Sequence, residues 1–514
     1  MVQPNSQPRH PAARHGRPPS AATLGELRAD GHVYRSVKEE IRQNLLDRMR
    51  AGQDRFPGII GFGNTVLPHL ERSLLAGHDV ILLGERGQGK TRLIRTLAGL
   101  LDEWAPAVAG CEINDHPYVP VCARCRRLAE ELGEDLPIVW RNARDRYGEK
   151  LATPDTSVGD LIGDIDPVKV AEGRTLGDPE TVHYGLVPRT NRGIFCLNEL
   201  PDLAERIQVA LLNVLEERDI GVRGYALRLP LDVVLVASAN PEDYTNRGRI
   251  ITPLKDRFGA EIRTHYPLTL DDELGLIQQE AVVGWDGAVP GAELPEHLTE
   301  IIARFTRLVR ESPAVDSRSG VSARFAIAAA ESAAASAVRR SALTGGTAAS
   351  PASPAGRRST SRATHRATGP AAPPAAEQPV ARVCDLPAIV GTLRGKVEFE
   401  VSEEGREEEV LAHLLRRAIA ETFRSRLGSA DLSPLLAKFD GGQTVESGEL
   451  TSASDLLQSV GEVPGLAKIM QRLGMDGSES FGHAAAAIEF ALEGLYLMRR
   501  LSKDTMDGST VYRT

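Results

Sequence analysis

The sequence is poor in several features that mark other classes of protein. Its five cysteines in 514 residues are too few for the disulfide scaffold of a secreted domain. It contains no apolar run long enough to span a bilayer, and its first residues lack the apolar core of a secretory signal. The net charge is -9, whereas a general nucleic-acid binder has an excess of basic residues. These absences predict a cytoplasmic protein with neither a membrane nor a nucleic-acid partner.

A phosphate-binding pattern stands out against this background. The segment Gly84-Glu85-Arg86-Gly87-Gln88-Gly89-Lys90-Thr91 follows an apolar run and fits G-x-x-x-x-G-K-[ST]. In such a loop the backbone N–H groups surround a polyphosphate, the lysine reaches its terminal phosphates and the threonine hydroxyl faces Mg²⁺. A helical pattern over 92–101 supplies the helix that must follow. The sequence therefore predicts a nucleotide-binding P-loop.

Five apolar stretches predict the strands of a parallel sheet. They cover residues 80–84, 150–152, 193–197, 233–239 and 260–265, and helical patterns lie between them. Strands that alternate with helices form a parallel sheet covered on both faces, so the predicted fold class is α/β.

Two of these stretches end in polar residues that suit ATP hydrolysis. Asn198 and Glu199 follow the strand at 193–197, and Asn240 follows the strand at 233–239. A carboxylate at the first position can polarise the attacking water, and an amide at the second can orient that water or sense the γ-phosphate. We therefore expect Glu199 and Asn240 to act together with Lys90.

Four segments in this order resemble the motifs of an AAA+ ATPase, namely Gly84–Thr91, Gly193–Glu199, Ala237–Pro241 and Asp256–Gly259. More narrowly, they are similar to the MoxR and magnesium-chelatase I-subunit group. Four further segments resemble that group: 56–61, with Ile60, as the part that packs on adenine; 153–163 after the second strand; 164–189 as its helix insertion; and 220–229 as its β-hairpin. The resemblance implies a P-loop AAA+ core with a five-stranded parallel sheet, an all-α lid and a ring, usually hexameric, that hydrolyses ATP with Mg²⁺.

The resemblance also gives roles to two arginines. Arg257 matches the arginine finger that reaches the ATP of the adjacent copy, and Arg324 matches the sensor-two arginine at the start of a lid helix, with Arg318 as its rival. Arginine suits both roles because its planar, charged fork grips phosphate oxygens.

Asn198 departs from the family pattern, which has Asp at the position that holds Mg²⁺. An amide can still accept a hydrogen bond from a metal-bound water, but it adds no charge. We therefore expect Thr91 to contact Mg²⁺, Asn198 to act through water, and turnover to be slow. A scaffold that binds ATP without hydrolysing it is the alternative.

A second candidate site lies in an insert over 105–146. Cys111, Cys122 and Cys125 can take three corners of a zinc tetrahedron, with His116 as the natural fourth ligand and Asp115 or Glu112 as substitutes. The spacing is not that of a standard zinc finger, so reduced thiols and an iron–sulfur site stay open beside zinc.

Composition divides the chain into segments. We expect a disordered tail over 1–22, N-terminal helices over 23–55, the nucleotide-binding domain over 56–267, a helical lid over 268–344 and 379–404, a disordered Ala/Pro/Ser/Arg linker over 345–378, and a C-terminal helical region over 405–514.

The leading interpretation is an ATPase ring that remodels or loads a partner protein, which the MoxR resemblance implies to carry a von Willebrand factor A domain. A magnesium-chelatase ATPase subunit for porphyrin metalation is the second candidate. A sigma-54-type transcriptional regulator is the third, but its Gly-Ala-Phe-Thr-Gly-Ala loop is absent from this sequence.

Overall fold

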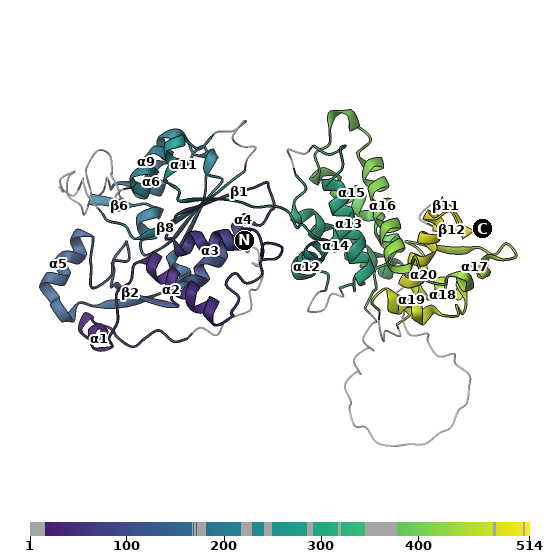
Figure 1. The fold of residues 1–514 in the computed structure, drawn as a ribbon, viewed down its shortest axis with the longest axis horizontal. Coiled ribbons are helices and arrows are strands. Elements are labelled where there is room, and N and C mark those ends of the chain that lie inside the picture. The colour runs from purple at the N-terminus through teal and green to yellow at the C-terminus, as the bar shows by residue number, and fades with distance from the viewer. Residues whose placement is uncertain are drawn as a thin grey trace, which may run out of the picture. The chain divides into compact units, whose positions relative to one another are not determined.

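The computed structural model describes residues 16–166, 168, 171, 181–216, 229–240, 249–284, 291–316, 320–344, 378–475, 480–506 and 509–514. The chain forms two compact units, Met1–Tyr266 and Pro267–Thr514 (Figure 1). The predicted linker except Gln378, the predicted hairpin except Leu229, Arg318, and parts of the predicted tail and helix insertion lie outside the described residues.

A five-stranded parallel sheet forms the centre of the first unit, with the strand order β4-β7-β8-β1-β9. The strands are β1 (Val80–Leu83), β4 (Tyr147–Leu151), β7 (Gly193–Asn198), β8 (Val233–Ala239) and β9 (Ala260–Arg263). All neighbouring strands of this sheet are parallel, so their carboxyl ends meet at one edge. This edge carries the P-loop and the polar strand ends.

Side chains alternate between the two faces of this sheet, as the strand period requires. Ile81, Leu83, Phe195 and Leu197 enter one core cluster. Their neighbours in the sequence enter a second cluster on the opposite face. Helices cover both clusters, because single strands buried on both faces must be packed from each side.

The covering helices supply the apolar faces for these clusters. The second cluster is packed by α2 (Val37–Arg50), α3 (Val66–Leu75) and α4 (Lys90–Thr96), and the first by α9 (Glu205–Glu216) and α11 (Thr252–Arg257). Figure 1 shows α2 and α3 on one side of the strands and α9 and α11 on the other. The helix after the P-loop is shorter than the predicted 92–101, because the chain tightens into a 3₁₀ turn, η1 (Leu97–Leu100).

The remaining described elements of this unit lie within the insert or before and after it in the chain. They are α1 (Leu24–Ala29), β2 (Trp104–Val108), α5 (Ala123–Leu132), η2 (Gly133–Asp135), β3 (Ile138–Asn142), η3 (Ala143–Arg146), α6 (Val158–Leu161), β5 (Gly163–Ile165), β6 (Val182–Tyr184), α8 (Leu186–Arg189) and η5 (Leu200–Asp202). β2 and β3 pair antiparallel, as do β5 and β6.

A buried ion pair joins α2 to the edge of the sheet. Arg146 donates two hydrogen bonds to Glu40, at 2.8 and 2.7 Å, and a third to the backbone oxygen of Arg192. Both side chains are almost fully buried. Such a pair is costly to break on one side, because the remaining charge loses its partner away from water.

The second unit contains mainly helices around one hydrophobic core. Its helices are α12 (Leu270–Glu280), α13 (Glu296–Arg310), α14 (Ala323–Leu343), α15 (Pro387–Leu393), α16 (Glu407–Leu427), α17 (Ser433–Leu436), α18 (Ala453–Val460), α19 (Leu466–Arg472) and α20 (Phe481–Leu497), with short 3₁₀ turns η6 (Val383–Asp385), η7 (Arg394–Lys396), η8 (Val401–Glu403) and η9 (Ala437–Phe439). The predicted lid and C-terminal region therefore share one core.

The C-terminal region also holds a small antiparallel sheet that the sequence analysis did not predict. Its strands are β10 (Val445–Gly448), β11 (Ser502–Met506) and β12 (Ser509–Arg513), in the order β10-β12-β11. Among the described residues, no helix combines the length and hydropathy required to cross a bilayer.

Candidate functional site

The P-loop connects β1 to α4 and depends on glycine at two positions. Gly89 has a φ of 76°, a left-handed conformation that glycine adopts without a side-chain penalty. At Gly84, an added Cβ would collide with the Thr264 hydroxyl and the Gln88 amide. Thr264 Oγ1 donates to Gln88 Oε1 at 2.7 Å, which ties the loop to the end of β9.

Lys90 joins the P-loop to the end of β8. Its ammonium group is buried and donates to the backbone oxygens of Gly84 and Glu85 and to Asn240 Oδ1, the last at 2.7 Å. Asn240 Nδ2 in turn donates to Glu199 Oε2 at 2.7 Å. The structure thus brings together the three residues that the sequence analysis expected to act on the phosphates. Their positions follow from parallel pairing, because β7 and β8 end at the same edge as β1.

Thr91, Asn198 and Ser238 form a second polar group at this edge. Asn198 Oδ1 accepts hydrogen bonds from Ser238 Oγ at 3.1 Å and Thr91 Oγ1 at 3.5 Å. Asn198 Nδ2 donates to Glu149 Oε1 at 2.8 Å. The amide of Asn198 therefore stands between two hydroxyls and a carboxylate, and its two ends are not interchangeable.

Glu149 is ion-paired on its other side with Arg95 of α4. The Arg95 Nε and Nη2 atoms each lie 2.9 Å from a Glu149 carboxylate oxygen. Burial alone would raise the pKa of Glu149, but the hydrogen bonds and charge of Arg95, together with donors from Tyr147 and Asn198, hold that pKa below its usual value. Glu149 is therefore an ionised carboxylate beside Asn198 at neutral pH.

Glu199 has an unusual backbone for a residue other than glycine. Its φ and ψ are 55° and 49°, in the left-handed region. Strained backbone of this kind costs on the order of 1–3 kcal/mol and occurs often at functional sites. The turn directs the Glu199 carboxylate toward Asn240, and the Glu199 N–H donates to Ser238 Oγ at 3.4 Å.

A cavity of about 420 Å³ lies on the β9 side of the P-loop. Gly84, Glu85 and Gln88 line it from the loop, together with Lys255 of α11 and Arg263 of β9. Lys90, Asn240 and Glu199 are not among its lining residues. The hydrogen-bonded side chains at the strand ends and this cavity are therefore distinct features of the surroundings of the P-loop.

The other expected nucleotide residues differ in their surroundings. Ile60 is half-buried in the segment whose Phe56 and Phe62 pack into the core with β1. Arg257 is paired within its own chain, because its Nε and Nη2 atoms lie 3.0 and 2.9 Å from Glu216 Oε2. Arg324 is exposed in the first turn of α14, in the other unit.

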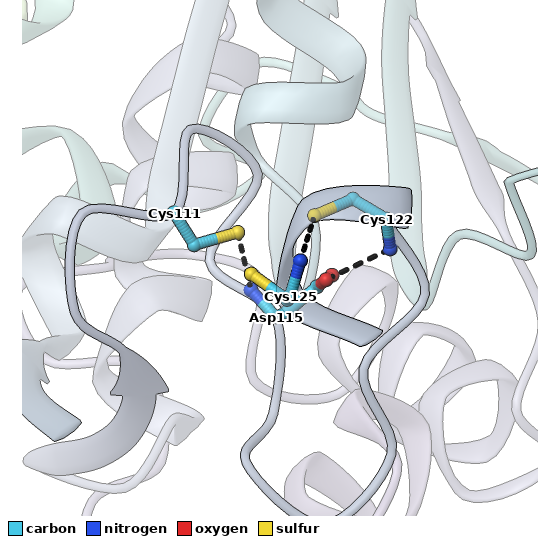
Figure 2. Close-up of side chains that lie close together, drawn as sticks. All are labelled: Cys111, Asp115, Cys122 and Cys125. Atoms are coloured by element: carbon cyan, nitrogen blue, oxygen red, sulfur yellow. Dashed lines mark hydrogen bonds between the residues drawn. The ribbon is translucent and has the colours of Figure 1, made fainter. Parts of the chain in front are cut away.

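The three insert cysteines meet, but His116 does not join them. Atoms of Cys111, Asp115, Cys122 and Cys125 lie within 4.8 Å of one another (Figure 2). His116 Nδ1 accepts a hydrogen bond from the Tyr118 N–H, and its Nε2 lies 3.2 Å from His32 Nε2. The assignment of His116 as fourth ligand is therefore wrong, because its ring packs against His32 and Tyr118 while Asp115 joins the three sulfurs.

Sequence reasoning missed two residues of the candidate site at this edge. Glu149 lies on β4, which begins at Tyr147, before the predicted start at Lys150. An acidic residue within a strand beside the Asn198 position was the available signal. Thr264 follows β9, and no sequence pattern connected it with Gln88.

Comparisons with known proteins identify similar sequences. Residues 174–257 match the model of the Sigma-54 interaction domain. The chain is 31% identical over 223 residues to the magnesium-chelatase 38 kDa subunit of Acidiphilium rubrum, covering 41% of this chain and 57% of that protein. It is 33% identical over 190 residues to magnesium-chelatase subunit ChlI of Cyanophora paradoxa, covering 36% and 51%. The chain thus spans about half the length of these curated relatives.

Solved structures also align with the chain. NtrX from Brucella abortus aligns at a TM-score of 0.34 and 14% identity, covering 60% of this chain and 56% of that one. A model of the complex between subunits BchI and BchD of magnesium chelatase aligns at 0.32 and 21%, covering 57% and 89%. TM-scores this low add nothing to the assignment. The sequence relatives and the five-stranded P-loop core support an AAA+ ATPase of the group that contains the magnesium-chelatase I subunit.

Proposed function

We propose that this protein binds and hydrolyses ATP at the edge formed by β1, β7 and β8. The observation that supports this most is the hydrogen-bonded chain from Lys90 through Asn240 to Glu199. It gives a phosphate-binding cation, an amide that spans cation and carboxylate, and a carboxylate that can act on water. These are the parts that phosphoryl transfer to water requires beside a metal ion.

Each of the three hydrogen-bonded residues has a distinct role in the proposal. Lys90 exchanges its bonds to the loop oxygens for bonds to the terminal phosphates. Glu199 accepts a hydrogen bond from the attacking water and polarises it. Asn240 keeps the Glu199 carboxylate in place through its Nδ2, and its Oδ1 senses the position of Lys90.

The oxygen donors at this edge fit a magnesium ion. The Thr91 hydroxyl and the Asn198 amide oxygen lie 3.5 Å apart, and Ser238 adds a second hydroxyl. Mg²⁺ takes oxygen ligands and keeps several waters, so one hydroxyl and water-mediated contacts suffice. When bound with ATP, Mg²⁺ neutralises charge that develops on the phosphates. Asn198 brings no charge to this site, and the nearest carboxylate on its strand pair, Glu149, is already paired with Arg95.

Assembly into a ring follows from the proposed role of Arg257. An arginine finger must reach the ATP of a second copy, so the site is complete only between two copies. In the single chain Arg257 is held by Glu216 across exposed surface. Such a pair contributes little to stability, so its exchange for a phosphate is inexpensive. Arg324 would couple the lid to nucleotide state in the same ring.

We propose that the ring remodels or loads a partner protein. The resemblance to the MoxR group implies a partner with a von Willebrand factor A domain. The curated relatives favour a second candidate, an ATPase subunit of a magnesium chelatase. Porphyrin metalation assayed with cognate partner subunits separates the two. The match to the Sigma-54 interaction domain model does not favour a transcriptional regulator, because the Gly-Ala-Phe-Thr-Gly-Ala loop of such regulators is absent from the sequence.

Phosphate release at saturating Mg·ATP tests hydrolysis against the scaffold alternative. Wild type should release phosphate above a Lys90→Ala control, with a rate per chain that rises with protein concentration as copies assemble. Native mass measured with and without ATP reports that assembly. Nucleotide binding without phosphate release, at every concentration, would leave the scaffold as the function.

A further inference from the structure

Four potential metal ligands converge in the insert from three stretches of chain. Cys111 follows β2, Asp115 lies in the next loop, and Cys122 and Cys125 start α5. One ligand atom from each lies within 4.8 Å of the others, and Figure 2 shows all four side chains turned toward one another. Ligands at about 2.0–2.3 Å from a tetrahedral ion lie roughly 3.5–3.8 Å apart, so small movements complete the site.

The surroundings of Asp115 give independent support for a cation site at this cluster. Its side chain is fully buried, with 0% exposure. Oδ2 accepts hydrogen bonds from the Val121 and Cys122 N–H groups at 3.1 and 2.8 Å, whereas Oδ1 has no hydrogen-bond partner. A buried oxygen without a partner is destabilising by about 1–3 kcal/mol, and more when the group is charged. A cation among the three sulfurs would satisfy this oxygen.

Backbone N–H groups are arranged to support negative sulfur. The Asp115 N–H donates to Cys111 Sγ and the Cys125 N–H to Cys122 Sγ, both at 3.3 Å. Cys122 is also the N-cap of α5, so its sulfur lies at the helix end where unpaired backbone N–H groups point outward. Together with the two N–H groups on Asp115 Oδ2, these contacts orient three of the four ligands in the way that surroundings of metal sites do.

We propose that Cys111, Asp115, Cys122 and Cys125 bind a structural zinc ion. Three thiolates and one carboxylate are a sulfur-rich set of four, which suits zinc in tetrahedral geometry better than magnesium or calcium. The protein supplies every ligand, so no position is open to water and the ion has no catalytic role. The site is separate from the nucleotide site and does not depend on the proposed ATPase activity.

The zinc would fix the insert against the core of the AAA+ domain. Ile113, Cys122 and Cys125 belong to the same hydrophobic cluster as Phe195 and Leu197 of β7. Two amides add hydrogen bonds to the chain just before β7: Asn114 Nδ2 donates to the oxygen of Arg189, and Asn191 Nδ2 to the oxygen of Ile113, at 2.8 and 3.1 Å. Loss of the ion should loosen these contacts.

Metal analysis of the full-length protein, purified without chelator, tests the proposal. Wild type should contain about one zinc per chain, since the four ligands form a single site. Cys122→Ser and Asp115→Ala should lose most of that zinc. His116→Gln and Cys384→Ser are the matched controls and should keep it, because His116 faces His32 and Cys384 lies in the other unit.

Cobalt replacement keeps the test independent of variant folding. Wild type stripped of metal and reloaded with Co²⁺ should show the visible bands of a tetrahedral site and the near-ultraviolet band of cobalt–thiolate bonding, and its melting temperature should rise on reloading. Wild type with neither zinc nor a tetrahedral cobalt spectrum would overturn the proposal, as would iron at this site. Zinc lost from His116→Gln but kept by Asp115→Ala would overturn the ligand set.

Discussion

Replacing Asn198 by Asp restores the acidic residue of the family pattern, yet we expect it to destabilise this protein. Asn198 is almost fully buried and donates through Nδ2 to the ionised Glu149 at 2.8 Å. The substitution puts a second carboxylate oxygen where this donor stands. The Asn at this position is therefore explained by Glu149 on the neighbouring strand.

The expected magnitude follows from charge and distance. Two unit charges about 4 Å apart repel by about 4 kcal/mol at an effective dielectric constant of about 20. Loss of the hydrogen bond leaves a buried group without its partner, at about 1–3 kcal/mol. Arg95 beside Glu149 offsets part of the repulsion. We expect Asn198→Asp to lower the free energy of unfolding by about 2–4 kcal/mol without Mg²⁺.

A double-mutant cycle in urea checks this reasoning. Glu149→Gln alone should change stability little, because its oxygen still accepts from Asn198 and its pair with Arg95 is exposed on the arginine side. The double variant Asn198→Asp/Glu149→Gln should recover most of the loss, since the new amide donates to the new carboxylate. Additive effects, or an Asn198→Asp variant as stable as wild type, would refute the reasoning.

Three further changes have defined outcomes. Burial, assisted by the charges of other basic residues nearby, lowers the pKa of His297 to about 3, and neither ring nitrogen has a hydrogen-bond partner. This pKa lies below the unfolded value of about 6.5, so the contribution to stability is complete above pH 6.5 and is lost as the pH falls. Between pH 7 and pH 5, the free energy of unfolding of wild type in urea should fall by about 2 kcal/mol more than that of His297→Leu. Equal losses in the two proteins would contradict the assignment. Glu40→Leu should lower the free energy of unfolding by about 3–5 kcal/mol, because Arg146 is left buried without its partner. Glu40→Leu/Arg146→Met should lose less, and a larger loss in the double variant would argue against this. Arg257→Ala should keep ATP affinity in calorimetry while phosphate release falls by about 10³-fold or more, and unchanged release would exclude the finger role.

The central sheet could be predicted because its strands are buried on both faces. Val80–Leu83 and Val233–Ala237 are continuous apolar runs, so the residues themselves reveal the strands. Parallel pairing then places Lys90, Glu199 and Asn240 at one edge. This is why the proximity of these three side chains could be anticipated without coordinates, whereas the hydrogen bonds between them could not.

Elements outside the central sheet were harder to predict from the sequence. β3 (Ile138–Asn142) has polar residues at its end and is only partly buried, and β11 and β12 contain mostly Ser, Thr, Lys and Asp, so none forms an apolar run. Spacing alone also could not decide between Asp115 and His116, because the direction of a side chain in an irregular loop depends on tertiary contacts. The pairing of Arg257 with Glu216 is likewise a contact between two helices that are far apart in the sequence.

The nucleotide that Glu199→Gln retains after incubation with Mg·ATP tests the account most directly. Lys90 and Asn240 are unchanged in this variant, so it should bind ATP and hold it unhydrolysed through gel filtration, while wild type should carry ADP. Equal amounts of ADP on both proteins, or no nucleotide on either, would contradict the proposal that Glu199 acts on the water at a P-loop held by Lys90.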